Sequence, residues 1–122
     1  MVVATVKDNG LSLKDEHGAV LRIKENICEN AFEIRVYGNL AASFISDFED
    51  EMLTVLTLGK DIHLDLSNVD TVCGGILNVL LFMQKEIDRT GKGKMRIVAP
   101  SRPVQRLLDE NGFYDLIDIA LQ

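Results

Sequence analysis

The spacing of apolar residues changes near residue 42, and this change constrains the possible folds more than any other feature. Before that point apolar side chains recur at every second position, as in Phe32, Ile34 and Val36, which indicates β-strands. After it, apolar residues recur at helical spacing. The predicted helices cover residues 43–58, 75–90 and 102–111. Strand-like segments at 61–66 and 95–99 separate them, so the order predicts an α/β fold.

One strand indicates how the layers are arranged. In the segment 61–66, three apolar residues alternate with the polar residues Asp61, His63 and Asp65. A parallel strand covered by helices on both faces would instead be apolar throughout. We therefore expect a mixed β-sheet with helices mainly on one face and a β-rich N-terminal extension. The central strands are expected near residues 33–37, 61–66 and 95–99.

Length and charge limit the classes of partner. The 122 residues fit a single domain, with residues 1–31 as the extension and 32–119 as the core. The net charge of −6 is a poor match for a phosphate backbone, so nucleic acid is not expected as a partner. No apolar run approaches the roughly 20 residues that a membrane span needs. We expect a cytoplasmic protein that does not bind a membrane, and its two cysteines fit a reducing compartment.

The sequence offers little catalytic chemistry. His17 and His63 are its two histidines, and neither has a cysteine or histidine partner at metal-ligand spacing. Neither a phosphate-binding GxxxxGK[ST] loop nor a GxGxxG loop is present. These observations predict a protein that is not an enzyme and that uses no metal or other cofactor.

One segment stands out, the strand, loop and helix of residues 63–77. Its loop is expected over residues 67–75, with Cys73 close to the start of the following helix. A group at Cys73 would lie at the positive end of that helix's dipole. A phosphate placed there would add roughly two negative charges and change the local surface.

Four segments of the chain, in this order and spacing, resemble the STAS domain of bacterial anti-sigma factor antagonists. They are Val-Tyr-Gly-Asn-Leu at 36–40, Leu-Asp-Leu-Ser-Asn-Val at 64–69, Gly-Ile-Leu at 75–77 and Val-Gln-Arg-Leu-Leu-Asp-Glu-Asn-Gly-Phe at 104–113. The resemblance covers about residues 32–119. It implies a non-enzymatic regulator that binds an anti-sigma factor, itself a serine kinase of the GHKL type, so that a sigma factor is released. In that family the kinase phosphorylates a serine in an Asp-Ser-Ser-Gly loop, and phosphorylation abolishes binding.

The chain departs from the family pattern at this loop. Aligning the final glycine with Gly75 places Val72 at the aspartate, Cys73 at the phosphorylated serine and Gly74 at the second serine. A second family aspartate, before the first helix, corresponds to Ala41. The resemblance therefore implies a binding module whose serine phospho-switch is lost or altered.

The nearest hydroxyls, Thr71 and Ser67, are the alternative phospho-acceptors. The predicted binding surface combines the loop with the exposed face of the helix that follows it. Its candidate partner-binding residues are Asn39, Ala41, Thr71, Cys73, Asn78, Phe82 and Lys85. The predicted partner is an anti-sigma factor or a related GHKL-type kinase.

Two other hypotheses remain open from the sequence. Cysteine thiols at helix N-termini are often reactive, so Cys73 could act as a thiol-based sensor. An enzyme of flavodoxin-like build could bind a small ligand at the strand ends, although the sequence offers no nucleophile–base pair.

Overall fold

A seven-stranded mixed sheet forms the centre of the computed structural model, which describes residues 2–7, 10–15 and 18–121. The strands are β1 (Val2–Lys7), β2 (Gly10–Asp15), β3 (Val20–Asn26), β4 (Ala31–Leu40), β5 (Asp61–Val72), β6 (Met95–Val98) and β7 (Asp118–Ala120). The α-helices are α1 (Ile45–Thr57), α2 (Gly74–Thr90) and α3 (Arg102–Glu110). Short 3-10 turns precede α1 at Ala42–Phe44 and β7 at Phe113–Asp115.

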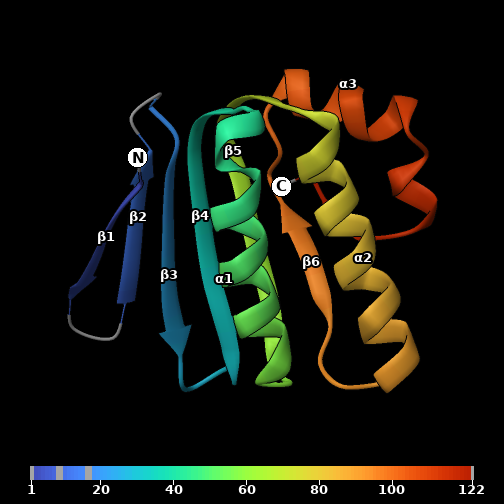
Figure 1. Cartoon of the computed structure of the whole chain (residues 1–122). Coiled ribbons are helices and arrows are strands. Elements are labelled where there is room, and N and C mark those ends of the chain that lie inside the picture. Colours follow the sequence, from blue (N-terminus) through green and yellow to red (C-terminus); the bar gives the residue numbers. More distant parts are fainter. Residues whose placement is uncertain (1, 8–9, 16–17, 122) are drawn as a thin grey trace.

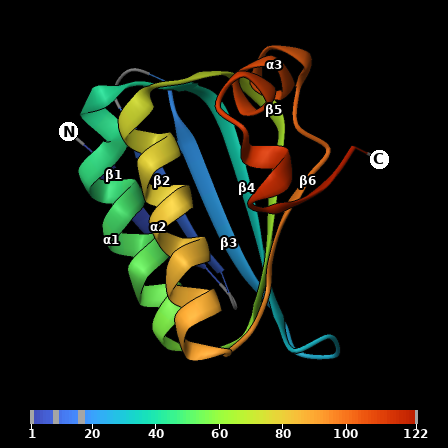
Figure 2. The ribbon, with the colours of Figure 1, turned by 90° about the vertical axis from the view of Figure 1, so that its right-hand side faces the viewer.

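The strands lie in the sheet in the order in which they occur along the chain. β1 to β4 pair antiparallel, whereas β4 to β7 pair parallel. Figures 1 and 2 show α1 and α2 side by side on one face of this sheet, with α3 near the ends of β5 and β6. The predicted mixed sheet with helices mainly on one face is confirmed.

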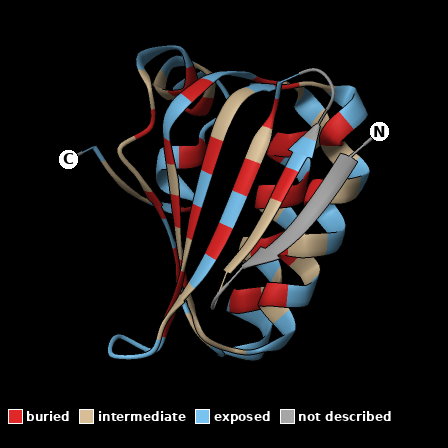
Figure 3. Cartoon of the chain, turned by 90° about the vertical axis from the view of Figure 1, so that its left-hand side faces the viewer, coloured by how far each residue is buried: buried red, intermediate tan, exposed pale blue. Residues whose placement is uncertain are grey.

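The core lies between the sheet and the helices because inward side chains of the strands meet the apolar stripes of α1 and α2. Ile34 of β4 and Ile62 and Leu64 of β5 are fully buried. Phe48 and Met52 of α1 belong to the same core cluster and are also fully buried. Figure 3 shows the resulting alternation of buried and exposed residues along the strands. The opposite face of the central strands keeps its polar residues in contact with solvent.

The expected loop over 67–75 is wrong over most of its length, because β5 continues to Val72. Two register shifts interrupt its pairing with β4, one between Arg35 and Tyr37 and one after Gly38. These irregularities change the spacing of inward side chains from every second to every third residue. Val69 and Val72 are therefore both buried, with exposed fractions of 1% and 6%. The loss of alternation suggested a loop, whereas it marks bulges within a strand.

Two glycines after α2 allow a matched test of backbone packing. Gly91 (φ +68°) and Gly93 (φ +72°) both adopt the left-handed conformation that glycine favours. A Cβ at Gly91 meets no described atom within 4 Å, whereas one at Gly93 would lie 2.6 Å from the backbone oxygen of Lys60. Both positions carry the same conformational penalty, but only Gly93 also carries a backbone clash.

We therefore expect Gly91→Ala to lower the free energy of unfolding by about 1 kcal/mol and Gly93→Ala by at least about 2 kcal/mol. Urea denaturation of the two variants beside the wild type measures the difference. Equal destabilisation by the two substitutions would contradict the close approach of Gly93 to Lys60.

Candidate functional site

The carboxyl ends of β4 and β5 meet at one edge of the sheet because the two strands run parallel. Asn39 pairs in register with Thr71, and Leu40 pairs with Val72. The Cys73 N–H then donates to the Leu40 carbonyl oxygen at an N···O distance of 2.9 Å. The structure thus brings together Asn39, Thr71 and Cys73, three of the residues predicted to bind a partner, and Ala41 directly follows β4.

Cys73 is the N-terminal cap residue of α2. Its extended backbone (φ −82°, ψ 164°) directs its carbonyl oxygen into the helix, where it accepts hydrogen bonds from Ile76 N–H at 3.1 Å and Leu77 N–H at 3.3 Å. Its side chain makes no capping hydrogen bond. The thiol is free, half-buried and packed against the core, so a group attached there would lie at the positive end of the α2 dipole.

The two glycines at the start of α2 differ in their surroundings. A Cβ at Gly74 would meet no described atom within 4 Å, so this position has room for a side chain. A Cβ at Gly75 would overlap Cδ1 of Ile45, the first residue of α1. Gly75 therefore allows the start of α2 to pack closely against the start of α1.

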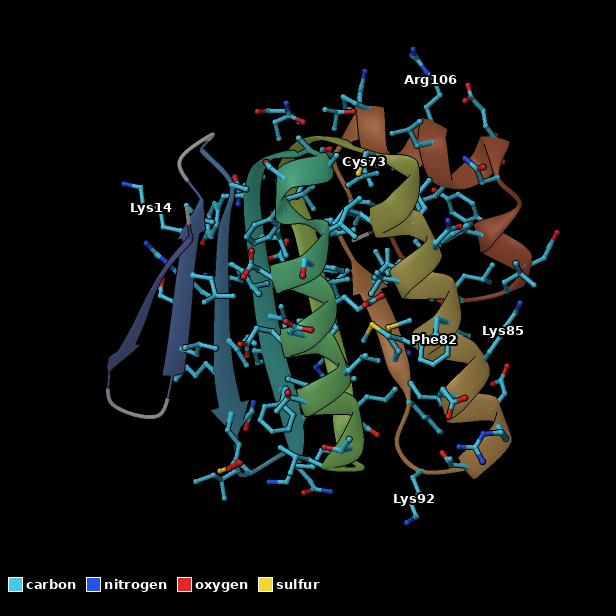
Figure 4. All side chains as sticks on the ribbon, viewed as in Figure 1. Lys14, Cys73, Phe82, Lys85, Lys92 and Arg106 are labelled. Carbon is cyan, nitrogen blue, oxygen red and sulfur yellow. The ribbon has the colours of Figure 1, made fainter. Side chains whose placement is uncertain are left out.

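An exposed stripe continues along α2 from this edge. Asn78, Phe82 and Lys85 follow at spacings of four and three residues, and all three side chains are exposed. Phe82 is 49% exposed, so its ring is accessible to a partner. Figure 4 shows Cys73 at the start of α2, with Phe82 and Lys85 further along the helix.

The two alternative acceptor hydroxyls lie in different places. Thr71 is exposed and lies beside Asn39 at the edge of the sheet. Ser67 lies further back in β5, where its N–H donates to Asp65 Oδ1 at 2.9 Å. Ser67 lies six positions before Cys73, which at ~3.3 Å per residue of extended chain corresponds to as much as ~20 Å. Thr71 belongs to the edge with Cys73, whereas Ser67 does not.

The sequence did not reveal how α3 is attached to this region. The Ser101 hydroxyl donates to the Val69 carbonyl oxygen at 2.5 Å, and the Ser101 N–H donates to the Leu66 carbonyl oxygen at 3.2 Å. These bonds join the residue before α3 to the irregular half of β5. A serine before a helix usually caps that helix, so its sequence position gave no signal for this contact.

Three carboxylates on α1 interact with one another. Glu51 is partly buried, and its burial, together with the negative charges of Asp50 and Asp47, raises its pKa above the ordinary value of 4.5. A carboxyl group whose pKa is raised by folding makes the folded state less stable when it is ionised. This penalty is present above the folded pKa and disappears as the pH falls below the unfolded value.

We expect Glu51→Gln to increase the free energy of unfolding at pH 7 and to show a smaller gain at pH 4. Chemical denaturation at the two pH values measures the gain. Glu49→Gln, an exposed position on the same helix, serves as the matched control and should change stability less. A Glu51→Gln gain that is the same at both pH values would contradict the proposed cause.

A hollow of about 430 Å³ lies elsewhere, on the outer side of α3. It is lined by Arg102, Gln105, Arg106, Asp109, Tyr114 and Leu121. None of these residues belongs to the predicted binding surface.

The thiol-sensor and small-ligand enzyme hypotheses stay predictions. Among the helices of the described residues, none has the length and apolar character needed to cross a membrane.

Comparison with known families gives one clear match. A family model described as "Mlab, STAS domain" matches residues 23–118, which is most of the chain. A search of curated proteins gave no match.

Several solved structures share the fold. An anti-sigma factor antagonist from Mycobacterium paratuberculosis superposes with a TM-score of 0.75 at 14% identity, over 89% of this chain and 91% of that one. The Thermotoga maritima protein TM1081 gives 0.71 at 22% identity, over 80% and 85% of the two chains. The unphosphorylated anti-sigma factor antagonist SpoIIAA gives 0.67 at 14% identity, over 82% and 87%. SpoIIAA of Bacillus in its phosphorylated form gives 0.63 at 14% identity, over 82% and 90%. At these identities the likeness establishes the fold alone.

Proposed function

This chain belongs to the STAS domain family, and we propose that it is a non-enzymatic cytoplasmic regulator that binds an anti-sigma factor or a related GHKL-type kinase. Binding would occupy the partner and so control transcription that depends on a sigma factor. The proposed surface consists of the β4–β5 edge and the α2 stripe. Its residues are Asn39, Ala41, Thr71, Cys73, Asn78, Phe82 and Lys85.

The observation that carries the proposal is the position of Cys73 between that edge and α2. The close contact between Gly75 and Ile45 explains why a glycine suits the end of the loop, since a side chain there would have to displace the Ile45 side chain. This supports the register in which Gly75 matches the family's glycine. In that register Cys73 occupies the position of the phosphorylated serine.

The chemistry at this position supports binding that serine phosphorylation does not control. Cys73 has no hydroxyl, and Gly74 has no side chain. Val72 is buried and apolar, so it does not replace the family's aspartate. Ala41 likewise carries no carboxylate. The loop is expected to act like the unphosphorylated, binding-competent form, with Thr71 as the nearest alternative acceptor.

Titration of the full chain against each GHKL-type anti-sigma kinase encoded in the same genome tests this function. Calorimetry should show saturable binding of one kinase in the absence of phosphorylation. Absence of binding to every such kinase would overturn the proposal. An unrelated GHKL-type ATPase provides the control for non-specific association.

A further inference from the structure

Three metal-ligating side chains meet on the face of the sheet that α1 and α2 leave open. His63 lies on β5, Glu33 on β4, and Glu29 in the turn between β3 and β4. One ligand atom from each side chain lies within 4.8 Å of the other two. The sequence did not predict this trio, because His63 lies 30 positions after Glu33 in the chain.

Strand register brings the first two groups together. Glu33 and His63 are direct partners in the parallel β4–β5 pair. Their side chains therefore leave the sheet on the same face, with His63 Nδ1 and Glu33 Oε1 3.1 Å apart. Two ligands of one tetrahedral zinc ion, each at about 2.0–2.1 Å, lie about 3.3 Å apart, so the observed separation already suits a shared ion.

The turn that carries Glu29 is held in place by hydrogen bonds of its backbone N–H and carbonyl groups. The Glu29 N–H donates to Asn26 Oδ1 at 3.2 Å, and Asn30 adopts a left-handed conformation with φ +53°. The Asn30 carbonyl oxygen accepts the Asp61 N–H at 3.3 Å, which ties the turn to the start of β5. Figure 2 shows this turn on the side of the sheet away from α1 and α2.

Local charge favours a cation between these groups. With a neutral imidazole, the two glutamates give the trio a charge of −2. Arg96, the register partner of His63, pairs with Asp118 at 2.7 Å. Lys24, the cross-strand partner of Glu33, is exposed on the same face and reduces the net charge of the group from −2 to −1, which still favours a cation. Half-exposed Glu33 and His63 also leave room for water on the outer side of an ion.

We propose that Glu29, Glu33 and His63 bind a divalent transition metal, zinc in preference, with a further coordination position open to water. Imidazole nitrogen with carboxylate oxygens suits zinc, whereas calcium and magnesium prefer oxygen ligands throughout. The site lies on the opposite face of the sheet from α1 and α2. It is independent of the proposed binding of a kinase.

Zinc titration of the chelator-treated full chain by calorimetry tests the site. We expect one zinc ion per chain, with affinity at least tenfold lower in His63→Ala and in Glu33→Gln. Asp65→Asn, on the same strand face, is the matched control and should bind as the wild type does. Circular dichroism of each variant confirms folding.

Cys28 in the same turn is the competing ligand, so Cys28→Ser is titrated in parallel. Unchanged binding by Cys28→Ser, with no thiolate-to-metal absorption when cobalt replaces zinc, supports the proposed ligands. The proposal is overturned if the wild type shows no saturable zinc binding or if His63→Ala binds normally. Loss of binding in Cys28→Ser overturns it as well.

Discussion

Replacing the exposed ring of α2, in Phe82→Ala, is expected to lower affinity for the kinase partner by at least about thirtyfold. Aromatic side chains at the centre of an interface commonly contribute 2 kcal/mol or more, and each 1.4 kcal/mol corresponds to a factor of ten. Phe82 is 49% exposed in the free protein, so its removal should change the free energy of unfolding little. A loss of affinity without a loss of stability would identify the ring as a binding group.

Leu58→Ala is the matched control for Phe82→Ala. Leu58 follows α1, is 58% exposed, and lies outside the proposed surface. Calorimetric titration of both variants against the same kinase, with thermal unfolding beside it, separates binding from stability. Equal affinities for Phe82→Ala and the wild type would show that the α2 stripe is not part of the interface.

A negative charge at the family's phospho-acceptor position should weaken kinase binding more than the loss of the Phe82 ring does. We expect Cys73→Asp to weaken kinase binding at least about a hundredfold, because an interface that buries the loop would have to desolvate an unpaired carboxylate. The fold should tolerate the change, since an anion at a helix N-terminus is stabilised by about 0.3–1 kcal/mol. Calorimetric titration measures the affinity, and the melting temperature reports on folding.

Two further variants give this prediction its controls. Cys73→Ser keeps the size and neutrality of the side chain, so binding should be retained. Cys28→Asp introduces the same charge in the β3–β4 turn, at the other end of the sheet from the start of α2, and should bind as the wild type does (Figures 1 and 4). Unchanged affinity of a folded Cys73→Asp would place this loop outside the interface.

Much of the fold was predictable because hydrophobic spacing is a local property. The three helices and the strand at 95–99 were each expected within a few residues of their observed bounds, and the strand at 61–66 was expected at the correct start. The second half of β5 was missed because two irregularities moved its inward residues from every second to every third position. Those irregularities depend on pairing with β4, which the strand's own sequence does not specify.

The candidate site was only partly predictable. The expected position of Cys73 at the start of α2 is confirmed, since a glycine pair before an apolar helical stripe is a local signal. The hydrogen bonds of Ser101 to β5 and the meeting of Glu29, Glu33 and His63 were not predicted. Both depend on strand register, which brings together residues that are far apart in the chain.

We propose that this STAS protein binds its kinase without a serine phospho-switch. The most direct measurement incubates the chain with the kinase and magnesium-ATP, re-isolates it, and determines its intact mass and its affinity for fresh kinase. Unchanged mass and unchanged affinity are predicted. Phosphate on Thr71 or Ser67, together with reduced affinity, would contradict the claim.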